Sequence, residues 1–133
     1  MRSPYNLLQE IYREDPWKVM VCCILLNQTT RKQVDKVRYE LFERWPDPLS
    51  MSQAEIETLA DLIRPLGFYK RRARTLTRFS KEWNEKRWQS PIELYGIGEY
   101  GQDSWKIFID NQMVEEPADH VLKDYIKWKK SLR

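Results

Sequence analysis

A single aspartate near the end of the chain has a setting typical of a functional carboxylate. Asp119 follows a Pro-Ala pair and precedes the only histidine of the sequence, just before a predicted helix over 121–131. A carboxylate in such a place can stabilise positive charge that develops on a substrate, or it can orient a water molecule for attack. Aspartate before a helix is also a common N-cap, and both roles are compatible because a cap holds the carboxylate still.

Upstream of Asp119, two glycines predict a tight turn between helices. Gly96-Ile97-Gly98 separates a short predicted helix over 91–95 from a longer one over 99–110. Glycine permits a sharp turn and lets a partner approach bare N–H groups at the next helix start, where the dipole favours an anion such as phosphate. A glycine pair alone is usually only a turn, so its combination with the aspartate carries the interpretation.

Several other kinds of site are excluded by the sequence. Its two cysteines, Cys22 and Cys23, are adjacent in an apolar run, which predicts packing residues and no disulfide framework, zinc knuckle or four-cysteine iron–sulfur loop. A lone histidine does not make a metal site. The apolar run over 19–26 is too short to span a bilayer, and no signal peptide is visible. We therefore expect an intracellular protein with no membrane partner.

Helical periodicity extends along the whole chain, and no segment alternates with the period of a strand. We therefore predict an all-α fold in which residues 1–133 form a single domain with two lobes. The predicted helices cover about 4–14, 16–27, 31–45, a segment between a Ser52–Glu55 capping box and Pro65, 69–86, 91–95, 99–110 and 121–131. The helix over 16–27 is apolar on all sides, which predicts the buried centre of the fold.

The helix over 69–86 is strongly basic and follows a loop with an apolar tip, Leu66-Gly67-Phe68. A charge run is usually a solvated face, and a loop aromatic usually folds back onto the core. Here the positive charges outnumber the negative ones and follow the loop directly, although the net charge of the chain is only +3. This arrangement favours contacts with phosphate, with Arg71 and Arg72 as candidates.

Taken together, these features resemble the helix-hairpin-helix DNA glycosylases of the endonuclease III superfamily. Over residues 3–128 the resemblance is carried, in order, by P-Y-N-L-L-Q-E, D-P-W-K-V-M, I-L-L-N-Q-T-T, R-P-L-G-F-Y-K-R-R-A and P-I-E-L-Y-G-I-G-E-Y-G. Within the superfamily the chain most resembles the thymine/uracil mismatch glycosylase domain of methyl-CpG-binding-domain proteins. The resemblance implies two helical lobes with the active-site cleft between them.

The resemblance also implies roles for individual residues. It assigns catalysis to Asp119, and it places Gln9 and Tyr100 in the pocket for a base rotated out of double-stranded DNA. Helical spacing alone would leave Gln9 exposed, and Tyr100 would as readily pack in the core. An amide matches the imide edge of a pyrimidine by offering one donor and one acceptor. The implied DNA contacts are Gln28, which fills the gap left by the base, the wedge residues Leu66, Gly67 and Phe68, the basic residues Arg71 and Arg72, and the hairpin glycines Gly96, Gly98 and Gly101.

One hairpin residue bears on the type of reaction that the resemblance implies. Superfamily members that also cleave the strand carry a lysine, which forms a Schiff base, where this chain has Tyr100. A tyrosine predicts a monofunctional glycosylase that leaves an abasic site. The resemblance further implies a monomer without a cofactor, a monovalent cation on the carbonyls near Gly96 and Gly98, and a nuclear location if the source is a eukaryote.

Two positions depart from the subfamily pattern. Gln28 stands where mismatch-specific members usually have arginine, and Val121 stands where close relatives often have lysine. Three hypotheses therefore stay open for the function. The chain is a glycosylase for thymine or uracil opposite guanine, a glycosylase for uracil in any context or for oxidised pyrimidines, or a DNA-binding module without catalysis.

Overall fold

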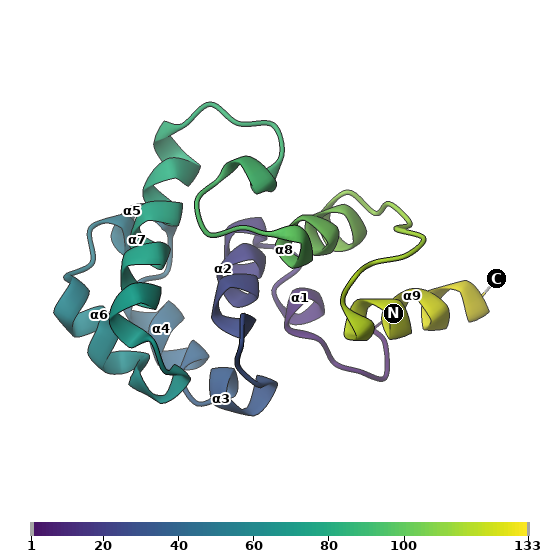
Figure 1. Ribbon diagram of the computed structural model, residues 1–133, viewed down its shortest axis with the longest axis horizontal. Coiled ribbons are helices and arrows are strands. Elements are labelled where there is room, and N and C mark those ends of the chain that lie inside the picture. Colours follow the sequence, from purple (N-terminus) through teal and green to yellow (C-terminus); the bar gives the residue numbers. More distant parts are fainter. Residues whose placement is uncertain (1, 133) are drawn as a thin grey trace.

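The structure is a computed structural model that describes residues 2–132, and all regular elements in this range are helical (Figure 1). The all-α prediction is confirmed. In order, the elements are α1 (Leu8–Ile11), α2 (Pro16–Leu26), α3 (Arg31–Asp35), α4 (Arg38–Arg44), α5 (Pro48–Ser52), α6 (Ile56–Leu62), the 3₁₀ turn η1 (Arg64–Leu66), α7 (Tyr69–Glu85), the 3₁₀ turn η2 (Pro91–Glu93), α8 (Glu99–Ser104), the π-helical turn η3 (Trp105–Ile109) and α9 (His120–Ser131).

Helix α2 runs through the middle of the molecule and forms the centre of the larger core (Figure 1). It begins as predicted, because the Asp15 carboxylate accepts the Lys18 N–H at 3.2 Å and Pro16 occupies the first turn. Its residues from Val19 to Leu25 are buried. The long helix α7 packs against α2, α5 and α6, which completes this lobe.

A smaller apolar cluster forms the other lobe, at the end of the molecule that carries α9 (Figure 1). Its buried members are Leu7, Ile107, Phe108, Leu122, Tyr125 and Ile126. The rings of Phe108 and Tyr125 lie 4.7 Å apart between centroids, so η3 and α9 are joined by aromatic contact. Tyr100 packs against both clusters and therefore lies at the junction of the two lobes.

The N-terminal helix is much shorter than predicted. The sequence pattern favoured a helix over 4–14 capped by Ser3, but α1 covers only Leu8–Ile11. The Ser3 N–H and hydroxyl both donate to the Glu10 carboxylate, at 2.7 and 2.5 Å, and these bonds hold the segment before α1 in a loop. This loop also changes the environment of Gln9, which is only 1% exposed. The exposure that helical spacing predicted for Gln9 is wrong.

Three other predicted helices also differ in the structure. The segment over 31–45 is divided into α3 and α4, and at the break Asp35 accepts hydrogen bonds from Arg31 and Arg38, both at 2.8 Å. The predicted capping box at Ser52–Glu55 does not form. Instead Asp47 caps α5 by accepting the Ser50 N–H at 2.8 Å, and α6 begins only after Glu55. The predicted helix over 91–95 is a single 3₁₀ turn.

The glycine hairpin is held against α7. Gly96 has φ of +89°, and a Cβ there would lie 2.6 Å from the Thr75 Cγ2, so only glycine permits this close approach without strain. Three tryptophan rings anchor the chain on either side of the hairpin, with centroids 4.8 Å apart for Trp83 and Trp88 and 5.7 Å apart for Trp88 and Trp105. These contacts on both sides hold the hairpin in place and so fix the start of α8.

Candidate active site and DNA interface

A cleft of about 770 Å³ lies between the two lobes and gathers side chains that are far apart in the sequence. Gln9 reaches it from α1, Tyr100 from α8, and Asp119 from the start of α9. The hairpin residues Gly96 and Gly98 form part of the same lining. The structure thus brings together the residues to which the family resemblance assigned catalysis and base binding.

Asp119 is fixed and accessible at the same time. One carboxylate oxygen, Oδ2, accepts the N–H of Leu122 at 3.0 Å, which makes Asp119 the N-cap of α9. Leu122 is fully buried and anchors the first turn of this helix. The Asp119 side chain is half-buried and lines the cleft. The capping role that the sequence suggested is therefore confirmed, and it leaves the carboxylate facing the cleft.

Gln9 and Tyr100 form a hydrogen-bonded pair within the cleft. The Gln9 Nε2 donates to the Tyr100 hydroxyl at 2.6 Å and to the Ser104 hydroxyl at 3.2 Å. Burial raises the pKa of Tyr100 far above its ordinary value, and the nearby Cys23 and Asp119 add to this shift. The Tyr100 phenol is therefore neutral at physiological pH and keeps a proton that it can donate.

Cys23 lines the cleft without offering a reactive thiol. Burial raises its pKa to about 12, a hydrogen bond from Ser104 opposes this shift, and the Asp119 charge adds to it. A thiol with such a pKa is neutral and a poor nucleophile. Cys22 is also fully buried. Both cysteines are packing residues, as predicted.

Gln28, which lines the cleft, and Phe68, on the loop before α7, both have a left-handed backbone conformation. Gln28 has φ of +59° and Phe68 has φ of +45°, a region that is costly for side chains other than glycine. Phe68 is 66% exposed, so its ring does not fold back onto the core. A groove of about 320 Å³ lies between them and is also lined by Arg71 and Tyr95. Gln28 and Phe68, which have this costly backbone conformation, are thus residues whose side chains are exposed.

The three residues of the predicted wedge differ in their placement. Leu66 is buried and anchors the loop, Gly67 turns it with φ of +74°, and only Phe68 projects as a large side chain. Helix α7 begins directly after this residue. Leu66 and Gly67 therefore hold the loop in a conformation that exposes the Phe68 ring.

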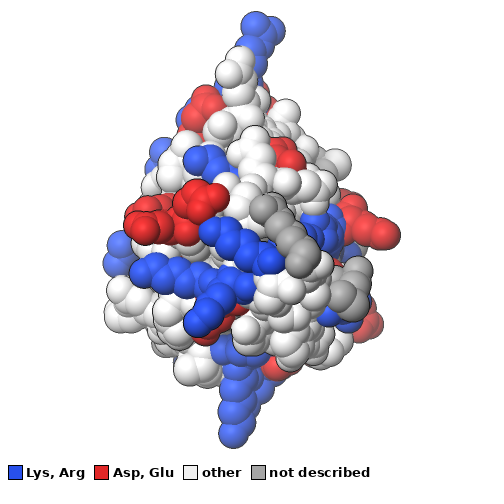
Figure 2. Space-filling model, turned by 90° about the vertical axis from the view of Figure 1, so that its right-hand side faces the viewer, with Lys and Arg blue, Asp and Glu red and all other residues white. Residues whose placement is uncertain are grey.

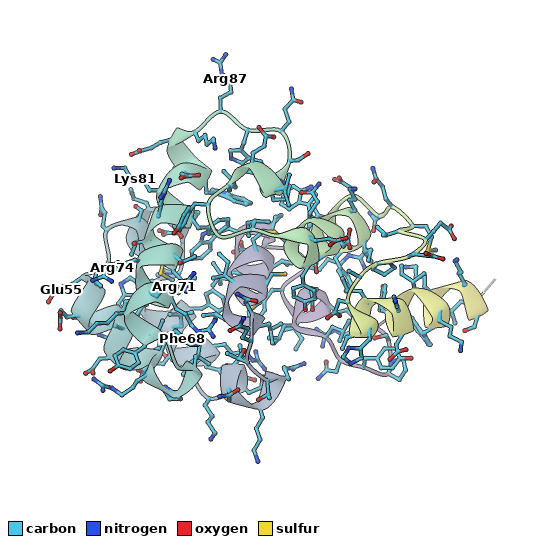
Figure 3. All side chains as sticks on the ribbon, in the orientation of Figure 1. Glu55, Phe68, Arg71, Arg74, Lys81 and Arg87 are labelled. Atoms are coloured by element: carbon cyan, nitrogen blue, oxygen red, sulfur yellow. The ribbon has the colours of Figure 1, made fainter. Side chains whose placement is uncertain are left out.

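The basic side chains of α7 fall into two groups. Arg71 and Arg74 are exposed and, with Phe68 and Lys81, follow the helix from the loop upward in Figure 3. Arg72 is buried instead, and its Nε donates to the Gly67 carbonyl at 2.9 Å. Burial lowers the pKa of Arg72, and the charge of Arg71 adds to this effect. Arg72 therefore supports the loop from beneath, and it also lines the groove that contains Gln28, Phe68 and Arg71, so its expected contact with phosphate stays a prediction.

The end of the molecule that carries α9 has a different charge pattern. Figure 2 faces this end and shows Lys and Arg side chains interspersed with Asp and Glu. On α9, the exposed lysines Lys123, Lys127, Lys129 and Lys130 outnumber Asp124, and Lys130 forms an ion pair with Glu115 at 2.8 Å. Basic side chains that can attract phosphate therefore occur on α9 as well as on α7.

Within residues 2–132, no cluster of three or more His, Cys, Asp and Glu side chains is arranged to hold a metal ion. No helix in the described part of the chain has the length and apolar character needed to cross a membrane.

One buried polar residue that contacts Gln9 was not among the predicted site residues. Ser104 has no exposed surface and its hydroxyl accepts a hydrogen bond from the Gln9 amide. The available signal was its spacing of one helical turn from Tyr100, which puts both residues on one face of the predicted helix over 99–110.

Comparison with known proteins identifies the family. Residues 21–128 match the model of the HhH-GPD superfamily base excision DNA repair proteins. The chain is 38% identical over 125 residues to the methyl-CpG-binding domain protein 4-like protein of Arabidopsis thaliana, covering 93% of this chain and 28% of that protein. It is 36% identical over 94 residues to a thymine-DNA glycosylase of Aeropyrum pernix, covering 65% and 42%. The chain thus spans less than half the length of these relatives.

The fold agrees with this assignment. A solved structure of a thermostable thymine-DNA glycosylase superposes with a TM-score of 0.71 at 19% identity, covering 78% of this chain and 52% of that one. The family match begins within α2, ends within α9, and includes the hairpin and Asp119. The chain therefore belongs to the HhH-GPD superfamily of base excision DNA repair proteins.

Proposed function

We propose that this chain is a DNA glycosylase that removes thymine or uracil mispaired with guanine and leaves an abasic site. The observation that carries the proposal is one cleft in which a capped carboxylate, Asp119, lies with the hydrogen-bonded pair Gln9 and Tyr100. The names of the relatives, which include a thymine-DNA glycosylase, fit this chemistry.

The geometry suits hydrolysis of an N-glycosidic bond. When the bond between the sugar C1′ and the base nitrogen breaks, its electron pair leaves with the base and positive charge develops on the sugar. Asp119 stabilises that charge and accepts a proton from the water molecule whose oxygen adds to C1′. Tyr100 donates a hydrogen bond to the departing base, because its phenol stays protonated. The base takes up a proton when it is released.

We also propose that the enzyme is monofunctional. Strand cleavage in this superfamily requires an amine that forms a Schiff base with the sugar. Of the described residues that line the cleft, none is a lysine, and the hairpin position carries Tyr100. A neutral phenol cannot form a Schiff base, so the expected product is an intact strand with an abasic site.

Duplex DNA fits the surface beside the cleft. In the proposed complex, Phe68 and Gln28 enter the base stack, and Arg71 and Arg74 contact phosphates. Carbonyl oxygens of the loop at 94–98 have the donor chemistry for a monovalent cation, which would add positive charge near a phosphate. The protein would act as a monomer inside the cell, and in the nucleus if the source is a eukaryote.

Asp119→Asn tests the catalytic assignment. Asparagine is also a good N-cap, so the fold and DNA binding should be retained while base release falls by roughly three orders of magnitude. Release is measured by alkaline cleavage of labelled duplexes, and the absence of cleavage without alkali reports a monofunctional enzyme. The matched control is Asp124→Asn on the exposed face of the same helix, which should behave as the wild type.

A panel of duplexes tests the substrate assignment. Uracil or thymine is placed opposite guanine, and uracil opposite adenine. Equal release of uracil from both contexts would favour a broader uracil glycosylase, which the glutamine at position 28 makes the natural alternative. No release from any of these duplexes, or from duplexes with oxidised pyrimidines, would contradict enzymatic function and leave a DNA-binding module.

A further inference from the structure

Ser104 is a buried side chain to which the proposed reaction assigns no role, yet it touches the base-binding amide. It is the last residue of α8, one helical turn after Tyr100, and it has no exposed surface. Its hydroxyl oxygen lies 3.2 Å from the Gln9 Nε2. An amide nitrogen donates and does not accept, so the Ser104 oxygen is the acceptor in this bond.

The protons of the Gln9 amide can be counted. An amide nitrogen carries two of them, and here one is donated to Tyr100 at 2.6 Å and the other to Ser104. No proton therefore remains for a base, in contrast to the expectation of one donor and one acceptor.

The oxygen of the Gln9 amide keeps a small accessible area, although the residue as a whole is only 1% exposed. Within residues 2–132, no hydrogen bond is donated to the Gln9 Oε1, and no buried side-chain nitrogen or oxygen lacks a partner. The Gln9 carbonyl oxygen must therefore reach the accessible surface of the cleft that this residue lines.

This arrangement gives the pocket a defined polarity. Gln9 presents an acceptor, and Tyr100, whose oxygen already accepts from Gln9, presents a donor proton. The ring nitrogen N3 of thymine and uracil carries a proton beside a carbonyl oxygen, which complements an acceptor next to a donor. The N3 of cytosine is unprotonated, so it would face the Gln9 oxygen with two acceptors opposed.

We propose that Ser104 is a positioning residue that fixes the orientation of the Gln9 amide and so selects pyrimidines with an N3–H donor over cytosine. The inference rests on the proposed function and adds to it the residue that sets the base specificity. Without the Ser104 oxygen, one amide proton loses its partner, and the amide can rotate to offer either end to the base.

The test measures base selectivity independently of bond cleavage. Two duplexes carry an uncleavable 2′-fluoroarabino nucleotide, either uridine or cytidine, opposite an abasic-site analogue, so that neither base has a pairing partner to lose. Fluorescence anisotropy gives the two Kd values. We expect the wild type to prefer the uracil duplex by about tenfold, the equivalent of one good hydrogen bond, and Ser104→Ala to reduce this preference to about threefold or less.

A matched control separates selectivity from stability. Ser80 is also fully buried and accepts a hydrogen bond from the Trp17 Nε1 at 3.1 Å, but unlike Gln9, the partner of Ser104, Trp17 does not line the cleft. Ser80→Ala should lower the melting temperature and retain the wild-type preference. If Ser104→Ala does not fold, Ser104→Cys carries the test, because sulfur is a weaker acceptor in a similar volume.

The possible outcomes are distinct. A folded Ser104 variant that keeps the full uracil preference would reduce Ser104 to a packing residue and overturn the proposal. A wild type that releases uracil from mispairs but binds both analogue duplexes equally would refute the amide polarity while the proposed function stands. A wild type that releases no base from any duplex would refute the proposed function itself.

Discussion

The two lobes support the cleft in unequal ways. The larger lobe is built around a helix buried on all sides, and α7 packs across it. The smaller lobe has six buried hydrophobic residues and joins α9 to η3 and the N-terminal segment. Tyr100 lies at the junction, whereas Asp119 begins a helix whose apolar contacts come from the smaller lobe.

This difference separates DNA binding from catalysis. The exposed ring of Phe68 and the basic face of α7 belong to the larger lobe, which can hold them in place even if the smaller one opens. Regions with few buried apolar contacts open locally at a lower free energy than the main core. We therefore expect disturbance of the smaller lobe to abolish base release before it weakens DNA binding.

The largest effect on base release and stability is expected from two leucine variants, one in each lobe, which test the difference between the lobes directly. Leu122 in the smaller lobe and Leu76 in the larger are both fully buried, and Leu→Ala at either site costs roughly 2–5 kcal/mol. Leu122→Ala should release α9 and lower base release by about a hundredfold, with duplex affinity within about threefold of the wild type. Leu76→Ala should lower the global melting temperature instead.

Hydrogen exchange of the α9 amides reports the opening, and anisotropy reports the affinity. If both leucine variants lower the same cooperative transition, and base release and binding fall together, the lobes form one cooperative unit and the comparison is wrong.

An intermediate effect is expected from two neighbouring arginines of α7. Arg72→Gln removes a buried hydrogen bond to the wedge loop and should cost about 1–3 kcal/mol in the free energy of unfolding, with little change in the salt dependence of binding. Arg71→Gln, at an exposed site, should leave stability within about 0.5 kcal/mol and reduce the slope of log affinity against log salt by roughly one. Urea unfolding and salt titration measure the two quantities. An equal loss of slope in both variants would show that Arg72 also reaches phosphate.

The smallest change in stability is expected at Phe68. Unlike the preceding variants, a substitution there should stabilise the fold. Phe68 has φ of +45° and little buried surface, so Phe68→Gly should raise the free energy of unfolding by about 0.5–1 kcal/mol while base release falls about tenfold. Phe68→Ala is the control, since it removes the ring and retains the strained Cβ. Stabilisation by alanine as well would mean that the exposed ring, rather than the backbone conformation, carries the cost.

Much of the fold could be predicted from local signals. The start of α2 follows from Asp15 and Pro16, and the start of α3 follows from Thr30, which accepts the Gln33 N–H at 3.2 Å. Where predictions failed, a polar contact that hydrophobic periodicity does not report changed the course of the chain. Ser3 bonds to Glu10 instead of capping a helix, and Arg38 turns back to Asp35 where one continuous helix was expected. Periodicity does not report such competition, because both arrangements bury the same apolar residues.

By itself, the sequence determined the helical composition, the buried centre, the hairpin and the aspartate at the start of the last helix. These depend on side-chain hydrophobicity, capping and backbone freedom, which act over a few residues. Only the tertiary structure decided which polar side chains meet across the cleft. Gln9 donates to Tyr100, 91 residues away, and to Ser104, 95 residues away. A hydrogen bond depends on the relative position of two packed lobes, and no local pattern encodes that position.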